Sequence, residues 1–126
     1  MKDLNEISGQ IVDAAFQLHT KLGPGLLESV YEVLMEHELT KRGLMVRRQV
    51  QVSFVYDGVH FDEGFRADLI VEDAIVVELK SLELLAPVHG KQVLTYLRLL
   101  DYRLGLLINF GAPVLKDGIK RIANNL

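Results

Sequence analysis

The sequence predicts a mixed β-sheet flanked by helices, a domain of the α/β or α+β class. Apolar residues recur at helical spacing in residues 5–21 and again in residues 26–42. Residues 46–80 instead alternate between apolar and polar positions or form short apolar runs, which is typical of strands. A helical segment that begins at Pro87 separates the last of these strands from the apolar run at 103–110. Because a helix between two such strands normally connects parallel neighbours, we expect a sheet with both parallel and antiparallel pairs.

Each element has a recognisable start or stop. The first helix ends at the Gly-Pro-Gly turn of residues 23–25, and Gly43 ends the second. Asp57-Gly58 predicts a hairpin turn. The expected strands span residues 46–56, 59–71, 75–80 and 103–110. The closing segment, residues 116–126, is expected to form a turn and a short helix. The core-facing helix positions are Ile7, Ile11, Val12, Ala15, Phe16, Leu18 and Leu22 in the first helix and Leu27, Val30, Tyr31, Leu34 and Met35 in the second.

Length and composition indicate one globular domain over residues 1–126. The chain of 126 residues is 49% hydrophobic and has a net charge of −3. Without cysteine, a metal would have to be held by oxygen or histidine ligands. The polar start and the lack of a long apolar run lead us to expect a soluble, cytoplasmic protein. The negative net charge means that nucleic-acid binding would need a local basic patch or metal ions.

The hairpin "RADLIVEDAIVVELKS", residues 66–81, carries charged side chains inside apolar strands. Asp68 shares a strand face with Arg66 and Ile70, and Glu78 shares a face with Lys80. A two-residue loop at 72–73 would place Asp68 and Glu78 on opposite faces of the sheet. A three-residue loop at 72–74, or a bulge, would place them opposite each other on one face. A shared site therefore requires the odd loop or a bulge.

Two carboxylates that face each other across paired strands repel, and a hard divalent cation between them removes that repulsion. Mg²⁺ prefers oxygen ligands and keeps several waters, so Asp68 and Glu78 with a substrate phosphate form a plausible set of ligands. Lys80 would then position or activate water. A structural ion-pair cluster of the same three residues is the alternative, and this segment alone favours it because short acidic patterns arise often by chance.

Two further segments carry candidate site residues. Glu28 in "GLLESVY" falls within the apolar arc of the second helix, between Met35 and Leu39 on a helical wheel, although a role at the helix N-terminus is as plausible. Gln92 and Tyr96 in "QVLTY" lie one helical turn apart just after the Glu78-x-Lys80 strand. Taken alone, such a pair usually has a structural role, with one residue in the apolar core and the other at its edge.

These segments together resemble the GxxExxY family, a group similar to the PD-(D/E)xK nuclease superfamily. The resemblance rests on "GLLESVYE", "YDG", "RADLIVEDAIVVELKS", "PVHGKQVLTYLRLLDYRLGLLINFG" and "GIKRI", and it covers roughly residues 5–122. It implies a restriction-endonuclease-like core in which Glu28, Asp68, Glu78 and Lys80 surround Mg²⁺. It also implies a QxxxY element matched by Gln92 and Tyr96. The Pro of the superfamily name is replaced by Ala67.

The resemblance makes a Mg²⁺-dependent nuclease the leading interpretation, with Mn²⁺ as a possible substitute. Asp68, Glu78 and Glu28 are the expected metal ligands and catalytic residues with Lys80, and Gln92 and Tyr96 are the expected substrate contacts. DNA is the favoured substrate over RNA, and no membrane role is expected. The alternative is a non-catalytic module that binds nucleic acid or protein and retains the nuclease fold, and a homodimer is possible in either case. Basic residues that could form a track for nucleic acid are Arg42, Arg47, Arg48, Lys91, Arg98, Lys120 and Arg121.

Overall fold

The computed structural model describes residues 3–126 of the chain, which fold around one five-stranded sheet. The elements are α1 (Leu4–Leu22), α2 (Glu28–Lys41), β1 (Val46–Tyr56), β2 (Val59–Val71), β3 (Ile75–Lys80), α3 (Pro87–Leu100), β4 (Leu104–Asn109), the 3-10 helix η1 (Leu115–Gly118) and β5 (Ile119–Ala123). Within the described range, no helix is both long and apolar enough to span a bilayer.

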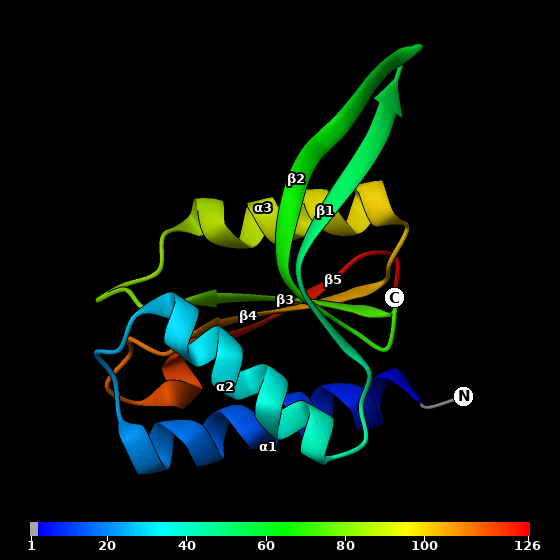
Figure 1. Cartoon of the computed structure of the whole chain (residues 1–126). Coiled ribbons are helices and arrows are strands. Elements are labelled where there is room, and N and C mark those ends of the chain that lie inside the picture. Colours follow the sequence, from blue (N-terminus) through cyan, green and yellow to red (C-terminus); the bar gives the residue numbers. More distant parts are fainter. Residues whose placement is uncertain (1–2) are drawn as a thin grey trace.

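The sheet is mixed, as the sequence predicts. Its strand order is β1-β2-β3-β4-β5, and only the β3–β4 pair is parallel. The α3 helix forms the crossover between those two strands and covers one face, while α1 and α2 cover the other (Figure 1). The predicted α+β class is therefore confirmed.

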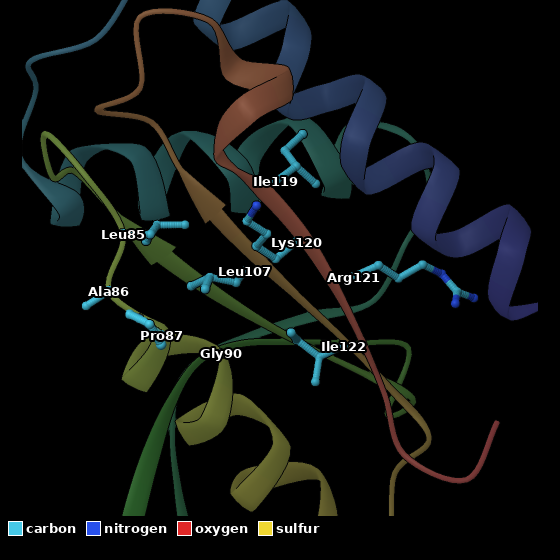
Figure 2. Close-up of a pocket in the computed structure, with 9 residues that line it drawn as sticks. All are labelled: Leu85, Ala86, Pro87, Gly90, Leu107, Ile119, Lys120, Arg121 and Ile122. Atoms are coloured by element: carbon cyan, nitrogen blue, oxygen red, sulfur yellow. The ribbon is translucent and has the colours of Figure 1, made fainter.

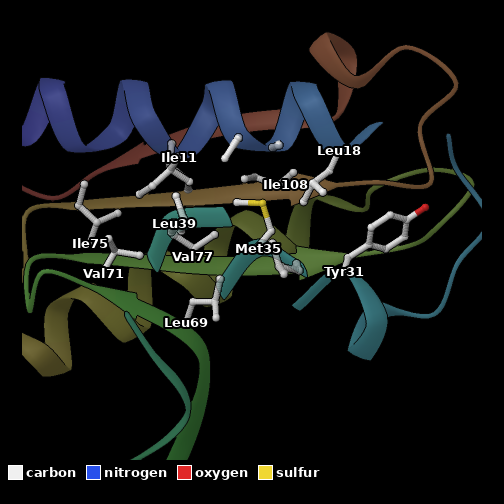
Figure 3. Packing of buried hydrophobic residues seen from close by; sticks show 14 of the residues in the cluster. Ile11, Leu18, Tyr31, Met35, Leu39, Leu69, Val71, Ile75, Val77 and Ile108 are labelled. Atoms are coloured by element: carbon white, nitrogen blue, oxygen red, sulfur yellow. The ribbon is translucent and has the colours of Figure 1, made fainter. Parts of the chain in front are cut away.

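Two apolar clusters hold the layers together. On the side of α1 and α2, Ile11, Met35 and Leu39 pack with the inward residues of the sheet, including Val77 and Ile108 (Figure 3). The second cluster lies under α3 and consists of Ala67, Ile70, Val76, Val93, Leu97 and Leu107. Because β3 and β4 are covered on both faces, they are apolar along nearly their whole length, and a charged residue in either strand needs a specific partner.

The β1–β2 ribbon changes faces halfway along its length. Leu69 belongs to the cluster beneath α1 and α2, whereas Ala67, two residues earlier, belongs to the cluster beneath α3. Regular alternation would put these two side chains on the same face, as the sequence analysis expected. The switch occurs opposite Gln49, whose φ of +50° lies in the left-handed region. From this point the ribbon bends away from the sheet and rises beyond α3 (Figure 1).

The prediction of a short C-terminal helix is wrong. Residues 115–118 form η1, and residues 119–123 form the edge strand β5, which pairs with β4. The three-residue spacing of Ile119 and Ile122 resembles a helical repeat, but β4 is buried and needs hydrogen-bond partners along its second edge. That requirement decides in favour of the strand.

The helical stripes also include positions that the structure leaves outside the core. Phe16, Leu22, Leu27 and Val30 are exposed. In α2 the buried positions are Tyr31, Glu32, Met35 and Leu39, so its inward face is rotated from the expected one. The rotation matters for the site because it turns Glu32, rather than the expected Glu28, toward the sheet.

Candidate active site

A three-residue loop joins β2 and β3 and brings the two hairpin carboxylates together. Val71 pairs with Ile75 and Leu69 with Val77, which leaves residues 72–74 as the loop. Glu72 and Asp73 both adopt left-handed backbone conformations there, with φ of +54° and +48°. The same register places Asp68 opposite Glu78, as a shared site requires.

Asp68 and Glu78 occupy the point where β2 leaves β3. The β2–β3 ladder reaches Leu69 and Val77, and beyond that pair side chains accept the backbone hydrogen bonds. The Asp68 backbone N–H donates to Glu78 Oε2 at 3.1 Å, and the Leu79 N–H donates to Asp68 Oδ2 at 2.9 Å. Each carboxylate thus uses one oxygen to satisfy the backbone of the opposite strand.

The closeness of the two carboxyl groups disfavours ionisation of both. Glu78 is only 5% exposed. Its pKa is raised from 4.5 to about 9, first because burial removes water and then because the Asp68 carboxyl group is hydrogen-bonded and negatively charged beside it. Without a cation, burial and the neighbouring carboxyl group therefore favour a form of the pair that holds one proton at neutral pH. A bound cation would take the place of that proton.

Lys80 supplies a positive charge next to the pair. It lies two residues after Glu78 and so on the same face of β3, and its charge lowers the pKa of Glu78, although by less than the causes that raise it. Its carbonyl accepts a hydrogen bond from the Phe110 N–H at 2.8 Å, which ties the end of β3 to the end of β4. The half-buried Lys80 side chain therefore extends from a strand end that this hydrogen bond holds in place.

Glu28 lies at the same end of the sheet but not in the apolar arc where the sequence placed it. The residue is exposed at the start of α2. Its Oε2 accepts a hydrogen bond from the Ser81 N–H at 3.3 Å, and the Ser81 hydroxyl donates to the Leu26 carbonyl at 2.7 Å. No three histidine, aspartate or glutamate side chains within residues 3–126 form a ready metal-binding group, so Glu28 does not join Asp68 and Glu78 in one.

Glu32 is the carboxylate that the sequence analysis missed. It is only 7% exposed, and its Oε2 accepts a hydrogen bond from Gln49 Nε2 at 2.7 Å. Burial raises its pKa most, the Gln49 hydrogen bond lowers it, and the negative charge of Asp68 raises it. Glu32 is therefore close enough to Asp68 for the two charges to interact. The spacing from Glu32 to Met35 and Leu39 was the available signal, because these three positions form one helical face.

Tyr96 borders the carboxylates from α3. Its ring stacks on Phe65 with centroids 4.0 Å apart and an angle of 10° between the planes. The pKa of its hydroxyl is raised, chiefly by burial and then by the negative charges of Glu78 and Asp68. Gln92, one turn earlier, is exposed, and its side chain makes no hydrogen bond within residues 3–126. The structure thus brings Tyr96 to the pair and leaves Gln92 on the surface.

Several basic residues of the predicted nucleic-acid track are already held in ion pairs. Arg42 pairs with Asp13 at 2.7 Å, and Arg47 pairs with Asp73 at 2.7 Å. Arg48 lies 3.5 Å from Glu36, a contact that holds β1 against α2. Lys91, Arg98 and Lys120 are exposed and have no ion pair within the described part of the chain. Arg121 is exposed as well and donates a hydrogen bond to Asn5 Oδ1 at 3.3 Å. Lys91, Arg98 and Lys120 are thus the members of the predicted track with neither an ion pair nor a side-chain hydrogen bond among the described residues.

A family model matches most of the chain. The model of the PD-(D/E)XK nuclease superfamily matches residues 5–122. The chain belongs to the PD-(D/E)XK nuclease superfamily. Neither curated proteins nor solved structures gave a match. Membership supports a nuclease-like function, and nucleases of this superfamily typically use divalent metal ions. The match to the narrower GxxExxY family remains a prediction.

Proposed function

We propose that this superfamily member is a metal-dependent nuclease that hydrolyses phosphodiester bonds in DNA. The observation that carries the proposal is the convergence of Asp68 and Glu78 at the end of the β2–β3 ladder, with Lys80 beside them. Such a group combines oxygen donors for a hard cation with a fixed positive charge for the phosphate.

The donor set fits Mg²⁺ or Mn²⁺. Asp68 and Glu78 offer carboxylate oxygens, and each uses one oxygen for a backbone N–H, which orients the other carboxylate oxygen. The raised pKa of Glu78 supports the fit. A divalent cation would offset the repulsion between the Asp68 and Glu78 carboxylates, which is one of the causes that raise this pKa. When bound, the cation supplies positive charge to the phosphate and lowers the pKa of its water.

The remaining residues have separate proposed roles. Lys80 orients or helps to deprotonate the attacking water and stabilises charge on the phosphate. Glu28 holds the backbone at Ser81, directly after Lys80, and in that way fixes the position of the lysine. Tyr96 and Gln92 line the approach to the site from α3, where they contact the DNA backbone. Glu32, whose pKa is raised by burial and by the charge of Asp68, is a further carboxyl group near Asp68.

A non-catalytic binding module is the second candidate, and one observation favours it. Both hairpin carboxylates already accept hydrogen bonds from backbone N–H groups, as residues of a structural cluster would. In that case the fold would retain the pair to seal the point where β2 and β3 separate, and no metal would be needed.

Cleavage assays with matched variants separate the two candidates. Purified protein is incubated with supercoiled plasmid, single-stranded DNA, branched DNA and RNA, each with Mg²⁺, Mn²⁺ or EDTA. We expect metal-dependent cleavage of DNA that Glu78→Gln and Asp68→Asn abolish and that Glu6→Gln, at an exposed position in the first turn of α1, preserves. Absence of cleavage on every substrate, together with no calorimetric heat of Mg²⁺ or Mn²⁺ binding, would leave the binding module.

A further inference from the structure

The outer end of the β1–β2 ribbon, residues 52–65, forms an arm that rises beyond α3 (Figure 1). Tyr56 pairs with Val59, and Phe54 pairs with Phe61 two positions further in, so all four side chains lie on one face of the ribbon. The Phe54 and Phe61 rings stack at 4.9 Å. Tyr56 at the tip is 73% exposed. Two strands alone bury little, and an apolar face at such a tip is suited to contact with another surface.

The charge of the arm limits what that surface can be. Residues 49–65 contain no lysine or arginine, whereas Asp57, Asp62 and Glu63 are all exposed. An acidic arm is repelled by nucleic-acid phosphates and by anionic lipid surfaces. It fits a protein surface that combines an apolar hollow with a positive charge.

The chain itself offers such a surface at the opposite edge of the sheet. A groove of about 490 Å³ lies between the first turn of α3 and β5 (Figure 2). Its lining residues are Leu85, Ala86, Pro87, Gly90, Leu107, Ile119, Lys120, Arg121 and Ile122. None of these is acidic. Arg121 extends away from the groove and donates to Asn5 Oδ1 at 3.3 Å, whereas Lys120 lies beside Leu107 (Figure 2).

We propose that the arm of a second copy of this chain docks in this groove. Tyr56 fills the apolar hollow as an aromatic anchor, and Asp57 next to it meets Lys120 at the rim. The groove is large enough for the Tyr56 ring with a neighbouring aliphatic side chain. Each copy carries one arm and one groove, so two copies related by a two-fold axis can exchange arms and form both contacts.

The contact uses none of the proposed catalytic residues. None of Asp68, Glu78 or Lys80 lies in the arm or lines the groove. Self-association can therefore be measured without any substrate or metal, and its outcome does not depend on cleavage.

Sedimentation of single variants is the first test. We expect the parent chain to dimerise between about 5 and 200 μM, with Tyr56→Ser and Lys120→Glu each weakening association at least about tenfold. Asp57→Asn, which keeps a residue suited to the left-handed turn at φ +49°, should weaken it less. Leu84→Ser is the matched control, because Leu84 is 84% exposed and lies outside the groove. Melting curves establish that each variant is folded.

Mixing the variants tests the arm-and-groove arrangement itself. A Tyr56→Ser chain keeps its groove, and a Lys120→Glu chain keeps its arm. An equimolar mixture should therefore associate through one intact contact, and more strongly than either variant does alone. A parent chain that stays monomeric throughout this range, or a mixture no more associated than its components, would overturn the proposal. So would a Lys120→Glu chain that loses nucleic-acid binding and keeps the parent's sedimentation, since the groove would then hold nucleic acid.

Discussion

Replacing Glu78 with Gln removes a carboxyl group whose ionisation the fold disfavours. Glutamine has nearly the same shape, and its amide oxygen can accept the Asp68 N–H that Glu78 Oε2 now accepts. The pKa of Glu78 lies near 9 in the folded chain against 4.5 for an ordinary glutamate. Because the folded-state pKa is raised, the contribution of this group to stability is complete below about pH 4.5 and is lost as pH rises toward 9.

The size of the loss follows from linkage. Each pH unit between the two pKa values lowers the free energy of unfolding by up to about 1.4 kcal/mol through this group. From pH 5 to pH 8 the metal-free parent should therefore lose up to about 4 kcal/mol that Glu78→Gln does not lose. The two proteins should be similar in stability at pH 5, and the variant should be the more stable at pH 8.

Urea unfolding at pH 5, 6, 7 and 8, with EDTA or with Mn²⁺, measures this difference. Free Mn²⁺ at about 100 times its dissociation constant should stabilise the parent by about 2.7 kcal/mol and leave Glu78→Gln unchanged. Glu6→Gln is the control for loss of a surface charge. If Glu78→Gln is instead less stable than the parent at pH 8 and neither protein responds to Mn²⁺, the carboxylates and Lys80 form a structural ion-pair cluster. The metal site would then have to be abandoned.

Four further substitutions test the neighbouring residues. Glu32→Gln should reduce the loss of metal-free stability between pH 5 and pH 8, because burial raises the pKa of Glu32, whereas Glu28→Gln at an exposed position should shift urea unfolding by no more than about 0.5 kcal/mol. Lys80→Met should abolish plasmid cleavage while Mn²⁺ still raises the melting temperature, and loss of both would mean that Lys80 supports the fold. Tyr96→Phe keeps the ring stack on Phe65, so its melting temperature should match the parent; slower cleavage would then assign a role to the hydroxyl, and unchanged cleavage would exclude one.

The pairing of Asp68 with Glu78 could be predicted from the sequence. Side chains alternate between the two faces along a strand, so the length of the loop determines whether these two side chains share a face. Only a three-residue loop or a bulge could unite the two side chains, and the loop of residues 72–74 does so. The crossover logic likewise predicted the parallel β3–β4 pair. Both inferences depend on local periodicity, which the sequence displays directly.

The errors arose where tertiary contacts override local pattern. Periodicity placed Glu28 in the apolar arc of α2, but the helix rests on the sheet with Glu32 inward and Val30 outward. Apolar residues on several sides of α2 left its orientation to packing with α1 and the sheet. The face switch of the ribbon depends on the left-handed backbone of Gln49, which no side-chain pattern announces. For β5, the deciding factor was the unpaired edge of β4, a partner distant in sequence.

The turn at residues 72–74 is a surface loop in which the number of residues is constrained as well as the backbone conformation of Glu72 and Asp73. Surface loops generally tolerate insertions and deletions. Here the removal or addition of one residue would shift β3 by one position against β2 and turn Glu78 to the face opposite Asp68, unless a bulge absorbed the change. Val77 or Leu79 would then face the cluster under α3. Relatives that retain the paired carboxylates should therefore keep residues suited to left-handed backbone at positions 72 and 73, while changes in the length of the turn should occur by two residues or together with a compensating bulge.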